Sequence, residues 1–164
     1  MIETVEYKGK LYPQYQTTGN AAKFAIPFAK EILKGNGLDI GCNRAEWAYP
    51  DAMMIDLELD DEWSAYHLPD KEFDYIFSSH CLEHLTDWVG ALDYWGEHLK
   101  SDGVMFLYLP HYAQEYWRPW NNRKHINALM PNVLEDYFVD RGYKKIFVTE
   151  GYDLNHSFYA VAEK

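Results

Sequence analysis

The chain has 164 residues, and its composition excludes several classes of protein. It is 48% hydrophobic and 17% aromatic, which argues against disorder and predicts one domain with a sizeable core. Its formal charge of −11 argues against nucleic acid or an anionic membrane as a partner. No apolar run approaches the length of a membrane span, the first residues do not read as a signal peptide, and we expect Cys42 and Cys81 to be reduced. These features favour a soluble, cytoplasmic protein.

Strand and helix patterns alternate along the chain. Residues 1–18 show no clear period, and we expect an N-terminal arm on a single domain of residues 1–164. The predicted helices cover residues 20–33, 86–99 (with Thr86 as the N-cap) and 131–141. The predicted strands cover residues 38–40, 52–55, 73–77, 104–109, 144–149 and 156–162.

This order predicts an α/β fold. We expect a Rossmann-like, mostly parallel sheet with helices on both faces, and an antiparallel hairpin that closes the chain. The connections after the first and second strands are short, with room for one or two helical turns at most after the first. Ligands of such sheets bind at the carboxyl ends of the strands.

The unusual chemistry of the sequence gathers at those predicted strand ends. A tight turn at Gly41 follows the first strand, and Asp56 ends the second. Such a turn lets a nucleoside approach the backbone, and such an acid accepts hydrogen bonds from ribose hydroxyls. Asn43 and Ala45 stand where a G-x-G-x-x-G loop would place further glycines, so a ligand with a ribose but no pyrophosphate fits better.

Several segments in serial order resemble class I S-adenosylmethionine-dependent methyltransferases, of the small single-domain kind that acts on small molecules. The segments are residues 38–42, 55–56, 73–85, 99–103, 109–111, 124–127 and 134–143, within a likeness that covers residues 20–163. Two features depart from the family pattern. Asn43 and Ala45 replace glycines, and the spans after the first and second strands are shortened, which implies that a helix and one strand are reduced or missing.

The resemblance implies the residues that hold the cofactor, S-adenosyl-L-methionine. It places Asp39 and Gly41 at the methionine end, with the backbone of Cys42 and Asn43 nearby. Asp56 would take the ribose hydroxyls. The remaining implied contacts are Leu57, Ser64 and Ala65 at the adenine and Ser78 and Ser79 on the floor of the site.

A second motif admits a different interpretation. His80-Cys81-Leu82-Glu83-His84 matches H-x-x-E-H, an inverted zinc-protease signature that needs two histidines on one helical face, a glutamate base and a third ligand downstream. Here the motif directly follows a buried strand, and the methyltransferase family also accounts for it. We therefore expect no metal and keep a zinc hydrolase as a less favoured alternative.

The sequence thus predicts methyl transfer to an oxygen or nitrogen of a small-molecule acceptor by in-line displacement. His111, and then His80, are the candidates for a general base, while Tyr112, Trp117 and His125 are candidates for substrate contact. The alternative is an inactive module of the same fold that binds the cofactor or a partner. The oligomeric state is open.

Overall fold

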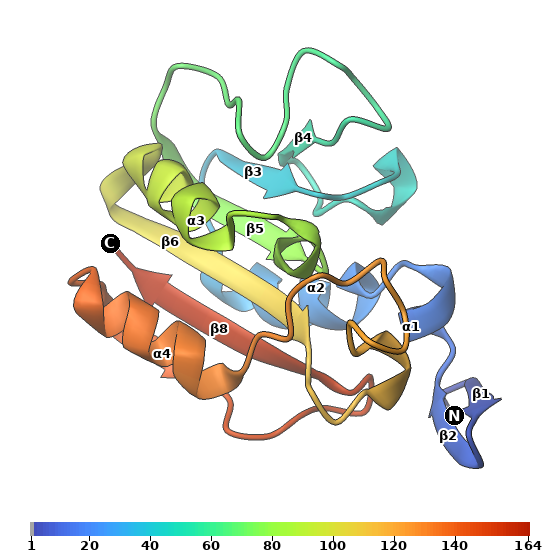
Figure 1. The fold of residues 1–164 in the computed structure, drawn as a ribbon. Coiled ribbons are helices and arrows are strands. Elements are labelled where there is room, and N and C mark those ends of the chain that lie inside the picture. Colours follow the sequence, from blue (N-terminus) through green and yellow to red (C-terminus); the bar gives the residue numbers. More distant parts are fainter. Residues whose placement is uncertain (1) are drawn as a thin grey trace.

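The structure is a computed structural model that describes residues 2–164, apart from the side chain of Gln16. Its centre is a six-stranded sheet in the order β4-β3-β5-β6-β8-β7 (Figure 1). The strands are β3 (Gly37–Ile40), β4 (Met53–Ile55), β5 (Phe73–Ser79), β6 (Leu99–Pro110), β7 (Lys144–Val148) and β8 (Ser157–Glu163). The first four run parallel, and β8 pairs antiparallel with both β6 and β7. The predicted parallel sheet with a closing hairpin is confirmed.

Helices cover both faces of this sheet, as predicted. Figure 1 shows α3 (Trp88–Glu97) and α4 (Pro131–Asp140) in front of the sheet and α2 (Ala22–Ile32) behind it. Ala25 and Ala29 of α2 are fully buried, and these small side chains let the helix approach the strands closely. On the other face, the larger Trp95 of α3 and Phe138 of α4 fill the space.

One helix start differs from the prediction. The N-cap of α3 is Asp87 rather than Thr86, and its carboxylate accepts a hydrogen bond of 2.9 Å from the backbone N–H of Gly90. Both residue types cap helices well, so the composition alone did not distinguish them.

The N-terminal arm is a hairpin of β1 (Thr4–Tyr7) and β2 (Lys10–Pro13), followed by the short helix α1 (Tyr15–Thr18). Its two turn residues, Lys8 and Gly9, both have positive φ, which suits a tight hairpin turn. The hairpin lies at the edge of the molecule (Figure 1) and contacts η3 (Glu115–Trp117), where Lys10 Nζ lies 2.6 Å from Glu115 Oε1. The sequence missed this hairpin because its strands are only four residues long, and one partner of its buried ring, Tyr12, is distant in sequence.

The connections on either side of β4 are short, as expected. The first holds one turn of 3-10 helix, η1 (Ala45–Trp47), and the second holds no helix in the described chain. A second such turn, η2 (Leu82–His84), follows β5. Cys42 and Cys81 are both free thiols. None of the described helices is long and apolar enough to cross a membrane.

Candidate functional site

A cavity of about 430 Å³ lies at the carboxyl ends of β3, β4 and β5. This volume falls within the usual range for small-molecule sites. Its wall also includes residues from the arm and the start of α2, and from the segment between η3 and α4. In chain order, the polar and aromatic lining residues are Tyr15, Thr17, Thr18, Asn20, Asp39, Cys42, Asn43, Arg44, Trp47, Asp56, Ser79, His80, Cys81, His84, Trp117, Lys124 and His125.

The turn after β3 is held against the end of β4. Gly41 has a φ of +86°, and its N–H donates to the carbonyl oxygen of Ile55 at 2.8 Å. The N–H of Asn43 donates a hydrogen bond of 2.7 Å to Asp56 Oδ2. The other carboxylate oxygen, Asp56 Oδ1, accepts a hydrogen bond of 2.9 Å from the N–H of Glu58. Each oxygen of Asp56 thus has one backbone donor and keeps acceptor capacity for the hydroxyls of a ligand.

Asp39 supplies a second carboxylate to the cavity. Its Oδ2 accepts a hydrogen bond of 2.6 Å from the backbone N–H of Tyr49. Burial, with a smaller contribution from Asp56, raises the pKa of Asp39 to about 7. A cationic ligand beside the two carboxylates would offset this penalty. Burial also raises the pKa of the Cys42 thiol to about 12, so this thiol is protonated and is not a nucleophile.

The two serines at the end of β5 have different surroundings. Ser78 Oγ donates to the carbonyl oxygen of Ile40 at 2.8 Å, and Ser78 does not line the cavity. Ser79 does line it, and its buried Oγ has no hydrogen-bond partner among the described residues. A buried hydroxyl of this kind usually meets a ligand or water. The donors and acceptors of the wall therefore fit a polar, cationic ligand with hydroxyl groups.

A buried carboxylate and three imidazoles meet beside the cavity. Glu83 is 1% exposed, and its Oε1 lies 3.7 Å from His80 Nδ1, 3.8 Å from His84 Nε2 and 3.7 Å from His125 Nε2. Burial raises the pKa of Glu83 to about 7, and burial lowers the pKa of His80 to about 3 and of His125 to about 2. The ring of Trp117 stacks on His125 with centroids 4.2 Å apart. The H-x-x-E-H motif identified His80, Glu83 and His84 of this cluster in the sequence. His125 joins them only because the fold brings its segment close to Glu83.

A family model described as a methyltransferase domain matches residues 17–148. The chain belongs to this methyltransferase family. No curated protein sequence matches it significantly. The prediction that the chain is a methyltransferase that uses S-adenosylmethionine is thus confirmed at the level of the family.

Solved structures share the fold of this methyltransferase at low sequence identity. A SAM-dependent methyltransferase from Archaeoglobus fulgidus has a TM-score of 0.67 and 16% identity over 92% of this chain and 97% of that one. The N-methyltransferase NodS from Bradyrhizobium japonicum, in complex with S-adenosylhomocysteine, has a TM-score of 0.59 and 16% identity over 92% and 87%. A third is 1,6-didemethyltoxoflavin-N1-methyltransferase from Burkholderia thailandensis, with a TM-score of 0.64 and 15% identity over 92% and 81%.

Three residues expected at the adenine do not line the cavity of this methyltransferase. Leu57 is 68% exposed. Ser64 and Ala65 lie in a loop anchored on α3, where Trp95 Nε1 donates to the carbonyl oxygen of Ala65 at 2.7 Å. Their contact with adenine stays a prediction.

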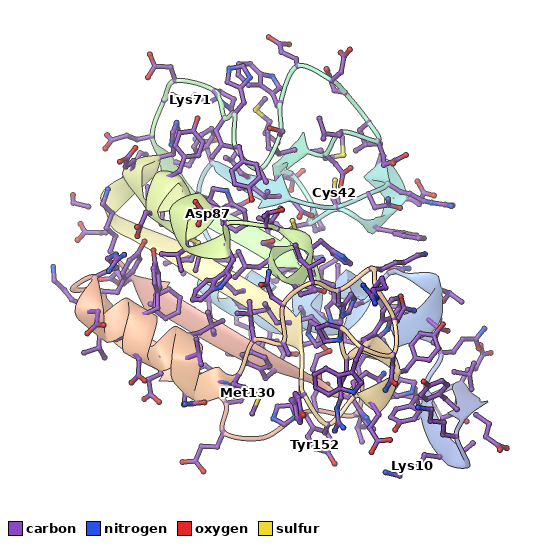
Figure 2. The ribbon with its side chains drawn as sticks, viewed as in Figure 1. Lys10, Cys42, Lys71, Asp87, Met130 and Tyr152 are labelled. Carbon is purple, nitrogen blue, oxygen red and sulfur yellow. The ribbon has the colours of Figure 1, made fainter. Side chains whose placement is uncertain are left out.

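Two residues expected at the substrate also lie outside the cavity. His111 Nδ1 accepts from the N–H of Ala113 at 3.0 Å, and its ring packs against Tyr152 with centroids 5.1 Å apart. In Figure 2, Tyr152 lies near the bottom of the view, well away from Cys42 in the turn after β3. The ring of Tyr112 lies under the guanidinium of Arg118, 4.1 Å away. The roles of His111 and Tyr112 also stay predictions, whereas His80, Trp117 and His125 do line the cavity.

The sequence missed the wall that the arm and η1 provide. Trp47 of η1 packs against Gly19, where an added Cβ would come within 2.7 Å of the ring. The guanidinium of Arg44 lies 4.7 Å from the same ring. In the sequence, the only signal was an aromatic residue, Trp47, in the short connection after β3. Its partner, Gly19, is distant in sequence and comes close only in the folded protein.

Proposed function

We propose that this methyltransferase transfers a methyl group from S-adenosylmethionine to an oxygen or nitrogen of a small-molecule acceptor. The supporting observation is the pair of carboxylates, Asp39 and Asp56, that faces one cavity at the ends of β3 and β4. When bound, the cofactor supplies a methyl group on a cationic sulfonium. Two carboxylates in a cavity wall complement such a cation electrostatically.

The chain's own residues would bind the two ends of the cofactor. Asp56 is positioned by Asn43 and Glu58 to accept hydrogen bonds from ribose hydroxyls. Asp39 and the backbone of the Gly41 turn would hold the methionine end. The free hydroxyl of Ser79 adds a donor on the floor.

In-line transfer needs the acceptor atom aligned with the carbon–sulfur bond, and positioning alone can lower the barrier substantially. His80 faces the cavity, but a pKa of about 3 makes its ring a weak proton acceptor near neutral pH. An amine with a free lone pair needs no base. A hydroxyl acceptor needs some other way to lose its proton.

A small acceptor is also consistent with two of the structural relatives. NodS is an N-methyltransferase, and the Burkholderia thailandensis enzyme was solved with bound 1,6-didemethyltoxoflavin and S-adenosylhomocysteine. Trp117 and His125, stacked in the cavity wall, offer flat surfaces on which a ring could pack.

Calorimetry with S-adenosylhomocysteine tests the cofactor site. We expect Asp56→Asn to weaken binding about 10- to 100-fold, because it removes the charge from hydrogen bonds worth about 1.5–3 kcal/mol. The matched control is Asp60→Asn, since Asp60 also accepts a backbone N–H two residues on but lies outside the cavity. We expect this control to bind like the wild type.

The outcomes separate the alternatives. If the wild type binds neither S-adenosylmethionine nor S-adenosylhomocysteine, the proposed function is wrong. If it binds both but methylates nothing in a broad panel of amines and hydroxyl compounds, the inactive cofactor-binding module replaces the enzyme.

A further inference from the structure

We propose that Glu83, His84 and His125 form a binding site for a divalent transition-metal ion in the wall of the cavity. The metal would hold the oxygen of a hydroxyl acceptor for methylation. The location of the site stands on its own geometry, whereas its role toward the acceptor rests on the proposed function.

The three side chains offer ligand atoms at compatible distances. The carboxylate oxygen and the two imidazole nitrogens all lie within 4.8 Å of one another. Glu83 Oε1 is 3.8 Å from His84 Nε2 and 3.7 Å from His125 Nε2. Ligand atoms around tetrahedral zinc, with bonds of about 2.0–2.1 Å, are about 3.3–3.4 Å apart. The two distances from Glu83 Oε1 would therefore contract by a few tenths of an ångström on coordination, and the distance between the two imidazole nitrogens by up to about 1.4 Å.

The tautomer of His84 leaves the right nitrogen free. His84 Nδ1 faces the carbonyl oxygen of Lys124, and a carbonyl can only accept, so Nδ1 carries a proton. Nε2 then carries the lone pair, and it lies 3.8 Å from Glu83 Oε1. Histidines that bind metals usually donate their other ring N–H to a carbonyl or carboxylate in this way, which orients the ring.

Glu83 lacks the partners that a buried carboxylate normally has. Neither of its oxygens accepts a hydrogen bond from any described residue, and the imidazole nitrogens at 3.7–3.8 Å are too distant for one. Leaving a carboxylate buried and unpaired is strongly unfavourable. A cation between the carboxylate and the two imidazoles would satisfy it.

The backbone holds the two parts of the site together. The carbonyl oxygen of Glu83 accepts from the N–H of Ile126 at 3.0 Å and from that of Asn127 at 3.1 Å. Asn127 Nδ2 donates to the carbonyl oxygen of Leu85 at 2.7 Å. The segment that carries His125 is thus fixed against the turn that carries Glu83 and His84 before any ion binds.

The donor set and its position indicate the chemistry. Two imidazole nitrogens and one carboxylate oxygen suit zinc, iron(II), cobalt or manganese better than magnesium or calcium. His84 and His125 both line the cavity, so remaining coordination positions can be reached from it. A metal lowers the pKa of a bound hydroxyl, which would activate a hydroxyl acceptor held there.

The proposed step is balanced without an oxidant or reductant. The metal-bound hydroxyl of the acceptor loses its proton to water. Its oxygen then forms a bond to the methyl carbon as the carbon–sulfur bond breaks, and the electron pair of that bond stays on sulfur. The products are the methyl ether and S-adenosylhomocysteine.

Cobalt(II) titration of chelator-treated protein, followed by visible absorption, tests the site. We expect one equivalent to bind to the wild type, with zinc(II) as a competitor. Glu83→Gln and His84→Ala should each weaken binding at least about 100-fold. The side chain of His84 is 40% exposed, so His84→Ala should fold even if the buried Glu83→Gln does not.

His67→Ala is the matched control, because His67 is also exposed and its Nδ1 also bonds to a backbone carbonyl, but it lies outside the cavity. It should bind cobalt like the wild type. A wild type that binds no more tightly than His84→Ala overturns the site, as does an equal loss in His67→Ala.

Two further measurements distinguish a failure of the metal site from a failure of the proposed function. Cobalt binding without S-adenosylhomocysteine binding leaves the site and removes the methyl-transfer role. With both bound, methylation of hydroxyl acceptors should fall at least 10-fold in metal-free protein and return with zinc, whereas amine acceptors should be unaffected. Equal activity toward hydroxyl acceptors with and without metal would overturn the role toward the acceptor.

Discussion

Replacing Gly41 by alanine tests what fixes the turn at the end of β3. Gly41 has a φ of +86°, and an added Cβ would lie 2.4 Å from Cys81 Cβ and 2.5 Å from Cys81 Sγ. Gly142 provides the comparison, because its φ is +75° and no described atom lies within 4 Å of an added Cβ. Both glycines have a positive φ, and they differ in their neighbours.

The structure separates two contributions to the loss of stability. Gly142→Ala introduces only left-handed backbone strain, worth about 1–2 kcal/mol. Gly41→Ala adds overlap with Cys81, and overpacking of a tight site costs about 1–3 kcal/mol more. We therefore expect the free energy of unfolding to fall by about 2–5 kcal/mol in Gly41→Ala.

Urea unfolding followed by circular dichroism measures these losses. Cys81→Gly removes both atoms that the new methyl group would meet. In a double-mutant cycle, Gly41→Ala should therefore lose about as much stability in the Cys81→Gly background as Gly142→Ala loses in the wild type. If Gly41→Ala costs the same with and without the Cys81 side chain, contact with Cys81 does not fix the turn and the reasoning fails.

Three other changes have expected outcomes. The pKa of Asp39 is about 7 in the folded protein, against an ordinary value of 3.8. At a pH between these two values, the unfolded chain has therefore lost a proton that the folded protein keeps. Relative to Asp39→Asn, the wild type should lose up to about 1.4 kcal/mol of stability per unit as pH rises from 4 to 7; a pH-independent difference in urea midpoints would contradict this. Trp95→Phe leaves the carbonyl oxygen of Ala65 without its hydrogen-bond donor and opens a cavity. Thermal unfolding should therefore show that the free energy of unfolding falls by about 2–3 kcal/mol. A decrease below about 1 kcal/mol would contradict this account of the hydrogen bond. Arg141→Ala removes an exposed pair with Asp93 at 2.7 and 3.0 Å. The small loss of stability in low salt should shrink in 1 M salt, and a large, salt-independent loss would contradict a surface ion pair.

Local patterns predicted most of the sheet. The strands β3 and β4, which end just before Gly41 and Asp56, were found from their short apolar runs next to a turn and an acid. The start of β6 was placed too late, at residue 104 instead of Leu99. Ser101-Asp102-Gly103 has turn composition, and the pairing register shifts there: Phe73 pairs with Leu99, whereas Tyr75 pairs with Val104. The strand therefore continues beyond this irregularity to Leu99, and only the pairing with β5 shows it.

The sequence alone determined the fold class, the methyltransferase family and the two acids that face the proposed cofactor site. These depend on residues close together in the chain. Only the tertiary structure decided which strand ends share a cavity, since His111 follows β6 yet packs against Tyr152 outside it. The same applies to His125, which the fold places 3.7 Å from Glu83. Contacts between segments distant in sequence depend on how the whole chain packs, and no local pattern records them.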